Sequence, residues 1–173
     1  MSRTPTDPAA PSHPFNRRIV GVWSLVDFRT EALSSLPTRY PLGSNPQGLL
    51  MYHPNGFMSG HLMKSEESLH SSPTGILNLG CAGSDVIGAS HWSMSYAGAY
   101  QVSDAQDSSP EDAAVISHSI HVTSNPQMMG TVQQRVACFN DRDLVLSTTE
   151  LVDVEGIIIR PVLTWRRVQG CTE

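Results

Sequence analysis

Three strand-like segments near the C-terminal end carry side chains that could do chemistry. These segments are residues 115–122, 131–139 and 144–149, and the connectors between them are rich in turn-forming residues. His118, His121 and Arg135 lie on these segments among apolar neighbours. Imidazole groups suit proton transfer, and a guanidinium suits the polarisation of a carbonyl or hydroxyl oxygen. In a sheet closed on itself every second residue points into the lumen, so some of these side chains are expected to face an enclosed space.

His118 and His121 have opposite parity along their strand, so they should point to opposite faces unless a bulge intervenes. Only one of them is expected to face the lumen. The face that carries Ser117, Ser119 and His121 is the more polar one, and it favours His121. No further ligand follows at H-x-H or H-x-x-x-H spacing, so no metal site is expected. The sequence also contains no phosphate loop or dinucleotide fingerprint, and no cofactor is expected.

Arg135 shares its face with Thr131 and Gln133. An inward arginine needs a carboxylate or a ligand oxygen, because burial of an unpaired charge is costly. Asp27 lies on the same predicted face of the first strand as Trp23, and it is the candidate partner. Asp27 and one of the histidines would move protons during catalysis.

Tyrosines add hydroxyl groups to the same predicted space. Tyr96 and Tyr100 share a face, and Tyr100, Tyr52 or Arg135 would polarise a substrate oxygen. The residues expected to bind substrate are Trp23, Tyr52, His61, Tyr96, Met128, Gln133 and Trp165. A structural alternative stays open, since such tyrosines are often half-buried barrel residues and methionines are more often plain core.

The composition argues against several other functions. The chain has 173 residues, a net charge of −5 at pH 7 and one lysine, Lys64, so nucleic-acid binding is not expected. Its three cysteines share no C-x-x-C spacing, which disfavours a disulfide framework or a structural zinc site. No apolar run resembles a signal peptide or a membrane span, so we expect a cytoplasmic protein without membrane contact.

Alternation of apolar and polar residues predicts eight strands. They are residues 19–28, 47–53, 57–64, 91–102, 115–122, 131–139, 144–149 and 156–168. Asn55-Gly56 is the strongest hairpin signal, and residues 65–91 are expected to form a lid or a loop with a short helix. We assign residues 1–16 to a disordered tail, 17–169 to one domain and 170–173 to a C-terminal tail. A meander of this size closes most economically as a β-barrel.

The GVW run with Gly21 and Trp23 resembles the G-x-W signature of lipocalins and other calycins. Further segments resemble the lipocalin-like domain family and follow one another in that family's order: residues 40–59, 96–102, 117–136, 143–148 and 163–167. Residues 65–95 depart from the family's pattern, since its usual helical insert has no match there. The resemblance implies an all-β antiparallel lipocalin-like (calycin) barrel of eight to ten strands, with a central cavity and at most one or two short helices.

The same resemblance bears on two of the candidate residues. The family has a histidine in the strand before an S-x-P turn, which favours His118 as the inward histidine. Lipocalin-type barrels also close one end with an arginine packed over the signature tryptophan. Arg135, Arg166 or Arg167 could fill that structural role.

Barrel proteins that this chain resembles occur in secondary-metabolite pathways as cyclases and isomerases. The leading hypothesis is therefore a cofactor-independent isomerase, cyclase or dehydratase that acts on a hydrophobic oxygenated small molecule inside the barrel. The first alternative is a protein that binds or carries such a molecule without converting it. A second alternative is a structural module with a barrel filled by side chains, which pairs with a second copy of itself.

Overall fold

The computed structural model describes residues 13–32, 37–64, 93–105, 112–154 and 156–169. In chain order its elements are α1 (Pro14–Ile19), β1 (Gly21–Ala32), β2 (Gln47–Tyr52), β3 (Phe57–Met63), β4 (Ser93–Asp104), β5 (Ala114–Thr123), the 3₁₀ helix η3 (Pro126–Met128), β6 (Val132–Asn140), β7 (Asp143–Thr148), β8 (Val152–Val154) and β9 (Ile157–Arg167).

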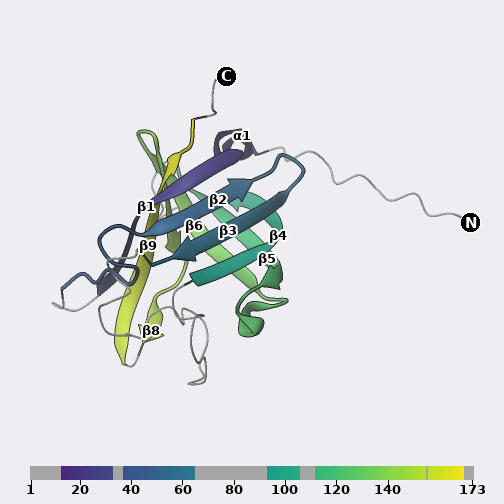
Figure 1. The fold of residues 1–173 in the computed structure, drawn as a ribbon. Helices are drawn as coiled ribbons and strands as arrows, with labels where there is room; N and C mark the ends of the chain where they lie inside the picture. The colour runs from purple at the N-terminus through teal and green to yellow at the C-terminus, as the bar shows by residue number, and fades with distance from the viewer. Residues whose placement is uncertain (1–12, 33–36, 65–92, 106–111, 155, 170–173) are drawn as a thin grey trace, which may run out of the picture.

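The nine strands form one antiparallel sheet, in the order β1-β2-β3-β4-β5-β6-β7-β9-β8. Pairing of β1 with β9 closes the sheet into a barrel of eight strands, and β8 is an extra short strand on β9 (Figure 1). The prediction of an all-β antiparallel barrel with eight to ten strands and little helix is confirmed. The lid predicted at residues 65–91 lies outside the described part of the chain.

The Asn-Gly hairpin lies where the sequence predicts it, between β2 and β3. The amide of His53 donates to the carbonyl of Phe57 at 2.8 Å, and Gly56 has a φ of 86°. Glycine adopts this left-handed conformation without the steric cost that a side chain adds. The sequence does not predict the strand β8, because three residues are too few to show an alternation of apolar and polar side chains.

A β-bulge in β1 changes which residues face the core. Leu25 pairs with Trp165 and Asp27 with Thr164, so Val26 is an extra residue on β1. One inserted residue moves the following side chains to the opposite faces. The sequence placed Asp27 on the Trp23 face, and this placement is wrong. Asp27 lies on the outer surface, and Phe28 takes the inward position.

Helix α1 covers one end of the barrel, beside the end of β9 (Figure 1). It starts at Pro14, so residues 14–16 are helical, although the sequence assigned them to a disordered tail. Phe15 and Ile19 are buried, and the Phe15 ring lies 5.0 Å from that of Phe139 on β6. The short helix therefore acts as an apolar plug for this end.

The signature tryptophan is fixed beneath this helix. The indole N–H of Trp23 donates to the carbonyl of Ile19 at 2.7 Å. The guanidinium carbon of Arg167 lies 4.2 Å from the centre of the Trp23 ring, and the same group donates to the carbonyls of Val20 and Arg18. Helix ends leave carbonyls without helical partners, and these two side chains supply donors. Of the three arginines considered for the structural role, Arg167 fills it.

Candidate ligand-binding site

Strand register brings the polar candidates onto the inward face of the barrel. Across β4, β5 and β6, Tyr100 pairs with His118, and His118 pairs with Gln133. Residues directly opposite each other in an antiparallel pair project to the same face. His118 is 1% exposed, so this row points inward. The prediction that only one of the two histidines faces the lumen is resolved in favour of His118.

Arg135 lies in the neighbouring row. It pairs with Ile116 on β5, which is fully buried, and with Thr148 on β7. The side chain of Arg135 is half-buried, and one of its terminal nitrogens donates to the carbonyl of Gln134 at 2.8 Å. Within the described residues, no carboxylate comes within 4 Å of this guanidinium to form an ion pair.

A hydrogen bond from the opposite wall completes the polar group. The hydroxyl of Tyr52 on β2 and Nε2 of His118 lie 2.9 Å apart, and both residues are buried. The Tyr52 ring meets the Tyr100 ring edge-on at 4.9 Å, and the Tyr96 ring lies 6.3 Å from the imidazole. Three tyrosines thus surround one histidine, which gives the site an aromatic wall with a polar centre.

Burial keeps these groups uncharged. It lowers the pKa of His118 to about 3, and the nearby positive charge of Arg135 adds to this shift. Burial also raises the pKa of Tyr52 and Tyr96 above their ordinary value, although Arg135 opposes the change. At neutral pH the site therefore holds a neutral imidazole, neutral hydroxyls and one guanidinium. Such a set donates hydrogen bonds well, but the imidazole is a weak base.

Two buried polar atoms of this face have no hydrogen-bond partner among the described residues. They are Nδ1 of His118 and the hydroxyl oxygen of Thr148. Buried polar atoms are nearly always paired with protein, water or ligand. Two free groups beside an unpaired guanidinium therefore mark a place where a polar atom of a ligand would be stabilised.

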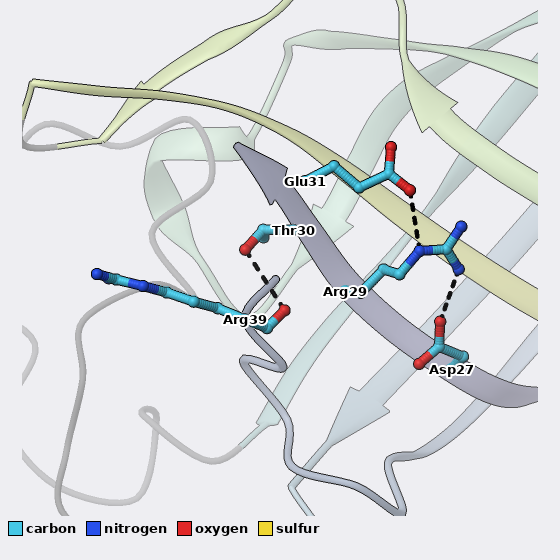
Figure 2. Close-up of polar contacts among 5 residues, drawn as sticks. All are labelled: Asp27, Arg29, Thr30, Glu31 and Arg39. Carbon is cyan, nitrogen blue, oxygen red and sulfur yellow. Dashed lines mark hydrogen bonds and ion pairs between the residues drawn. The ribbon is translucent and has the colours of Figure 1, made fainter. Parts of the chain in front are cut away.

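Two of the predicted catalytic residues lie away from this group. His121 is the extra residue of a second bulge, since Ile120 pairs with Gly98 and Val122 with Ala97; it is exposed, with its ring 6.4 Å from that of Phe57. Figure 2 shows Asp27 bonded to Arg29, which also contacts Glu31, on one side of β1. Neither residue can reach the inward group.

His61 is exposed and lies 3.0 Å from the hydroxyl of Ser59. It lines a separate pocket of about 650 Å³ formed by residues of β1 to β4, including Ser24 and Leu49. A second pocket, of about 440 Å³, lies beside Arg167 at the end that α1 covers. The structure therefore separates His61 from the histidine and tyrosines inside the barrel.

The remaining candidates are inward but differ in their surroundings. Trp165 is buried opposite Leu25, and its indole nitrogen has no partner in the described structure. Met128 is buried in η3 as part of the apolar core. Gln133 is half-buried and donates to the hydroxyl of Thr131 at 3.1 Å. Trp23 belongs to the end closed by Arg167, and its contacts there are structural.

Sequence reasoning missed Thr148 as a member of this face. The tight connection from Asn140 to Asp143 fixes the β6–β7 register, because these two residues pair directly. Counting outward from that pair puts Thr148 opposite Arg135, so the position of the turn predicts that Thr148 shares the face of Arg135.

The described ranges hold no cluster of three or more histidine, cysteine, aspartate or glutamate side chains that could bind a metal ion. In those ranges no helix is both long and apolar enough to cross a membrane.

Comparison with known proteins identifies the barrel. The model of the lipocalin-like domain family matches residues 20–168. A relative from Aspergillus oryzae (strain ATCC 42149 / RIB 40), the 4'-hydroxy-3'-methoxypropiophenone carrier protein ppsC, is 33% identical over 79 residues; the match covers 46% of this chain and 70% of the relative. The family match spans every barrel strand, from β1 to the end of β9. The chain belongs to the lipocalin-like domain family.

Proposed function

We propose that this protein binds a small oxygenated aromatic molecule inside the barrel and carries it without converting it. The observation that supports this most directly is the buried pair of Tyr52 and His118. Its free imidazole nitrogen lies in the field of Arg135. A ligand oxygen placed there would accept hydrogen bonds from groups that otherwise have no partner.

The walls around this pair favour an aromatic ligand. The rings of Tyr52, Tyr96 and Tyr100 offer edges and faces for ring contacts, and apolar residues such as Ile116 and Leu50 complete the buried surface. Pockets for small molecules typically combine apolar walls with a few fixed polar groups. The relative's name gives its cargo as a hydroxy-methoxyphenyl ketone, which has this combination of ring and oxygens.

The state of His118 favours a carrier over an acid–base enzyme. With a pKa lowered to about 3, the imidazole is neutral at pH 7 and attracts a proton only weakly. General bases work best when their pKa lies near the operating pH. A neutral imidazole can nevertheless hold a ligand through hydrogen bonds, which is all that a carrier requires.

Two histidines on one strand provide a matched test of binding. His118→Phe should weaken binding of 4'-hydroxy-3'-methoxypropiophenone about tenfold, because a hydrogen bond to the ligand is lost. His121→Phe should leave the affinity unchanged, since His121 is exposed on the outer surface. Isothermal titration calorimetry gives both dissociation constants. Equal affinities for wild type and His118→Phe would contradict the proposed site.

The second candidate function is a cofactor-independent isomerase, cyclase or dehydratase. The hydrogen bond between Tyr52 and His118 favours it, because a hydroxyl–imidazole pair could relay a proton to or from a bound substrate. Arg135 would then polarise the substrate's carbonyl oxygen. Tyr100 would have to give up the hydrogen bond that its hydroxyl donates to the carbonyl of His53 at 3.1 Å. Asp27 and His121 are not part of this proposal, since both lie on the outer surface.

Deuterium exchange separates the two functions. In D₂O a carrier should not speed the exchange of the CH₂ protons next to the ketone of 4'-hydroxy-3'-methoxypropiophenone, and we expect no acceleration above buffer. An enzyme with an active base would accelerate this exchange and lose the acceleration in His118→Phe. Proton NMR of the ligand measures the rate, and Asp27→Asn serves as a control on the outer surface.

A further inference from the structure

We propose that the barrel binds its ligand as an anion, with the guanidinium of Arg135 facing a phenolate oxygen. This inference rests on the proposed binding function and narrows the ligand to phenols acidic enough to ionise near neutral pH. A para-acyl phenol has this property, because the acyl group delocalises the negative charge of the phenolate.

The position of Arg135 carries the inference. Its cross-strand partners are Ile116, which is fully buried, and Thr148, whose buried hydroxyl has no partner in the described structure. A guanidinium has five N–H donors, and the contact to the Gln134 carbonyl engages one nitrogen. Donors of Arg135 therefore remain for a ligand, beside a threonine hydroxyl that can bind the same oxygen.

The other charged and titratable groups do not neutralise this cation. Besides Arg135, the inward titratable groups of the barrel strands are Tyr52 on β2, Tyr96 and Tyr100 on β4, and His118 on β5, and burial keeps all four in their neutral forms. Lys64, the residue after β3, is also buried and adds a second cation, not a counter-charge. The inward residues of β1, β3, β7 and β9 bring no carboxylate to this face: they are apolar apart from glycine, Thr30, Thr148 and the Arg167 at the closed end.

Carboxylates of the described strands are committed elsewhere. Asp27 and Glu31 contact Arg29, Asp143 contacts Arg166, and Asp104 contacts His13. The guanidinium of Arg135 therefore has no counter-charge from the carboxylates of the described residues. A cation in a low-dielectric site is stabilised by an anion far more than by a neutral oxygen.

Binding of the phenolate involves one proton. The phenol O–H bond breaks, the proton passes to solvent buffer, and the oxygen keeps the electron pair and faces Arg135. No other bond changes. Because the guanidinium favours the charged form, the pKa of the ligand's hydroxyl should be lower in the complex than in water.

An absorbance titration of bound 4'-hydroxy-3'-methoxypropiophenone tests this directly, since phenol and phenolate absorb differently. We expect the hydroxyl pKa in the complex to lie at least about one unit below that of the free ligand, a preference of about tenfold for the phenolate. Arg135→Met should abolish the shift. Arg160→Met, which removes an exposed arginine on the outer surface of β9, should leave it unchanged.

The methyl ether 3',4'-dimethoxypropiophenone distinguishes failure of this inference from failure of the binding function. It cannot ionise, so above the phenol's pKa it should bind about tenfold more weakly than the phenol. If both ligands bind equally and the bound phenol titrates at or above its free pKa, the inference is overturned and the binding function stands. If the protein binds neither ligand, both proposals fall together.

Discussion

Lowering the pH from 7 to 5 is expected to reduce the free energy of unfolding by about 2 kcal/mol through His118 alone. Burial lowers the pKa of this imidazole from 6.5 to about 3 in the folded protein. The unfolded chain therefore takes up a proton near pH 6.5, while the folded protein does so only near pH 3. The contribution is fully present above pH 6.5 and is lost progressively as the pH falls toward 3.

Urea unfolding at pH 7 and pH 5 measures this change. Carboxylates also titrate over this range, so the relevant quantity is the difference in pH dependence between wild type and His118→Phe. The variant should lose about 2 kcal/mol less than wild type between the two pH values. His121→Phe, with the same substitution at an exposed site, should behave as wild type. Parallel pH dependence of wild type and His118→Phe would show that the imidazole is hydrated inside the barrel.

The features that sequence predicts well here are local. Alternation located eight strands, and Asn55-Gly56 located the hairpin between β2 and β3, because strand period and turn conformation depend on neighbouring residues. The barrel followed from the number of strands and their short connections. His118 was also placed inward by resemblance to the family, although the polarity of the strand's two faces favoured His121.

Side-chain direction beyond a bulge could not be predicted in the same way. Val26 and His121 are each the extra residue of a bulge, and nothing in their own sequence neighbourhood distinguishes them from regular strand residues. The bulge at Val26 turned Asp27 outward, where Arg29 binds it, and this removed the predicted partner of Arg135. With Asp27 on the outer surface, Arg135 has no carboxylate partner among the described residues.

The choice among the three arginines likewise depended on contacts between distant residues. Arg166 and Arg167 are neighbours in the sequence, yet Arg166 pairs with Asp143 on the surface and Arg167 covers Trp23. Alternation along β9 puts them on opposite faces, but only the pairing of β9 with β1 places Arg167 over the tryptophan. With that role filled, Arg135 needs another explanation for its inward position.

Replacing Arg167 by methionine is expected to lower the free energy of unfolding by about 2 kcal/mol. The variant keeps an unbranched side chain but loses the stacked charge over Trp23 and the hydrogen bonds to the carbonyls of Val20 and Arg18. Because Arg167 stays exposed on its other side, screening by solvent limits the loss.

Gly21, the glycine of the G-x-W signature, leaves the space that Arg167 occupies over Trp23. Gly21 has a φ of 135°, and a Cβ placed on it would lie 2.5 Å from a terminal nitrogen of Arg167. Gly21→Ala should therefore destabilise the protein partly by displacing Arg167. The double variant with Arg167→Met should lose less stability than the sum of the single changes, because both act on one contact.

Arg166→Met is the matched control, one residue away on the same strand. Its ion pair with Asp143 is solvent-exposed, and exposed pairs of this kind contribute little to stability, so urea unfolding should detect little or no change. A loss of stability equal to that of Arg167→Met would mean that positive charge at the end of β9, and not the stacked position over Trp23, accounts for the effect. Without such a loss, the stacked position over Trp23 is what ties β9 to α1 and keeps this end of the barrel closed.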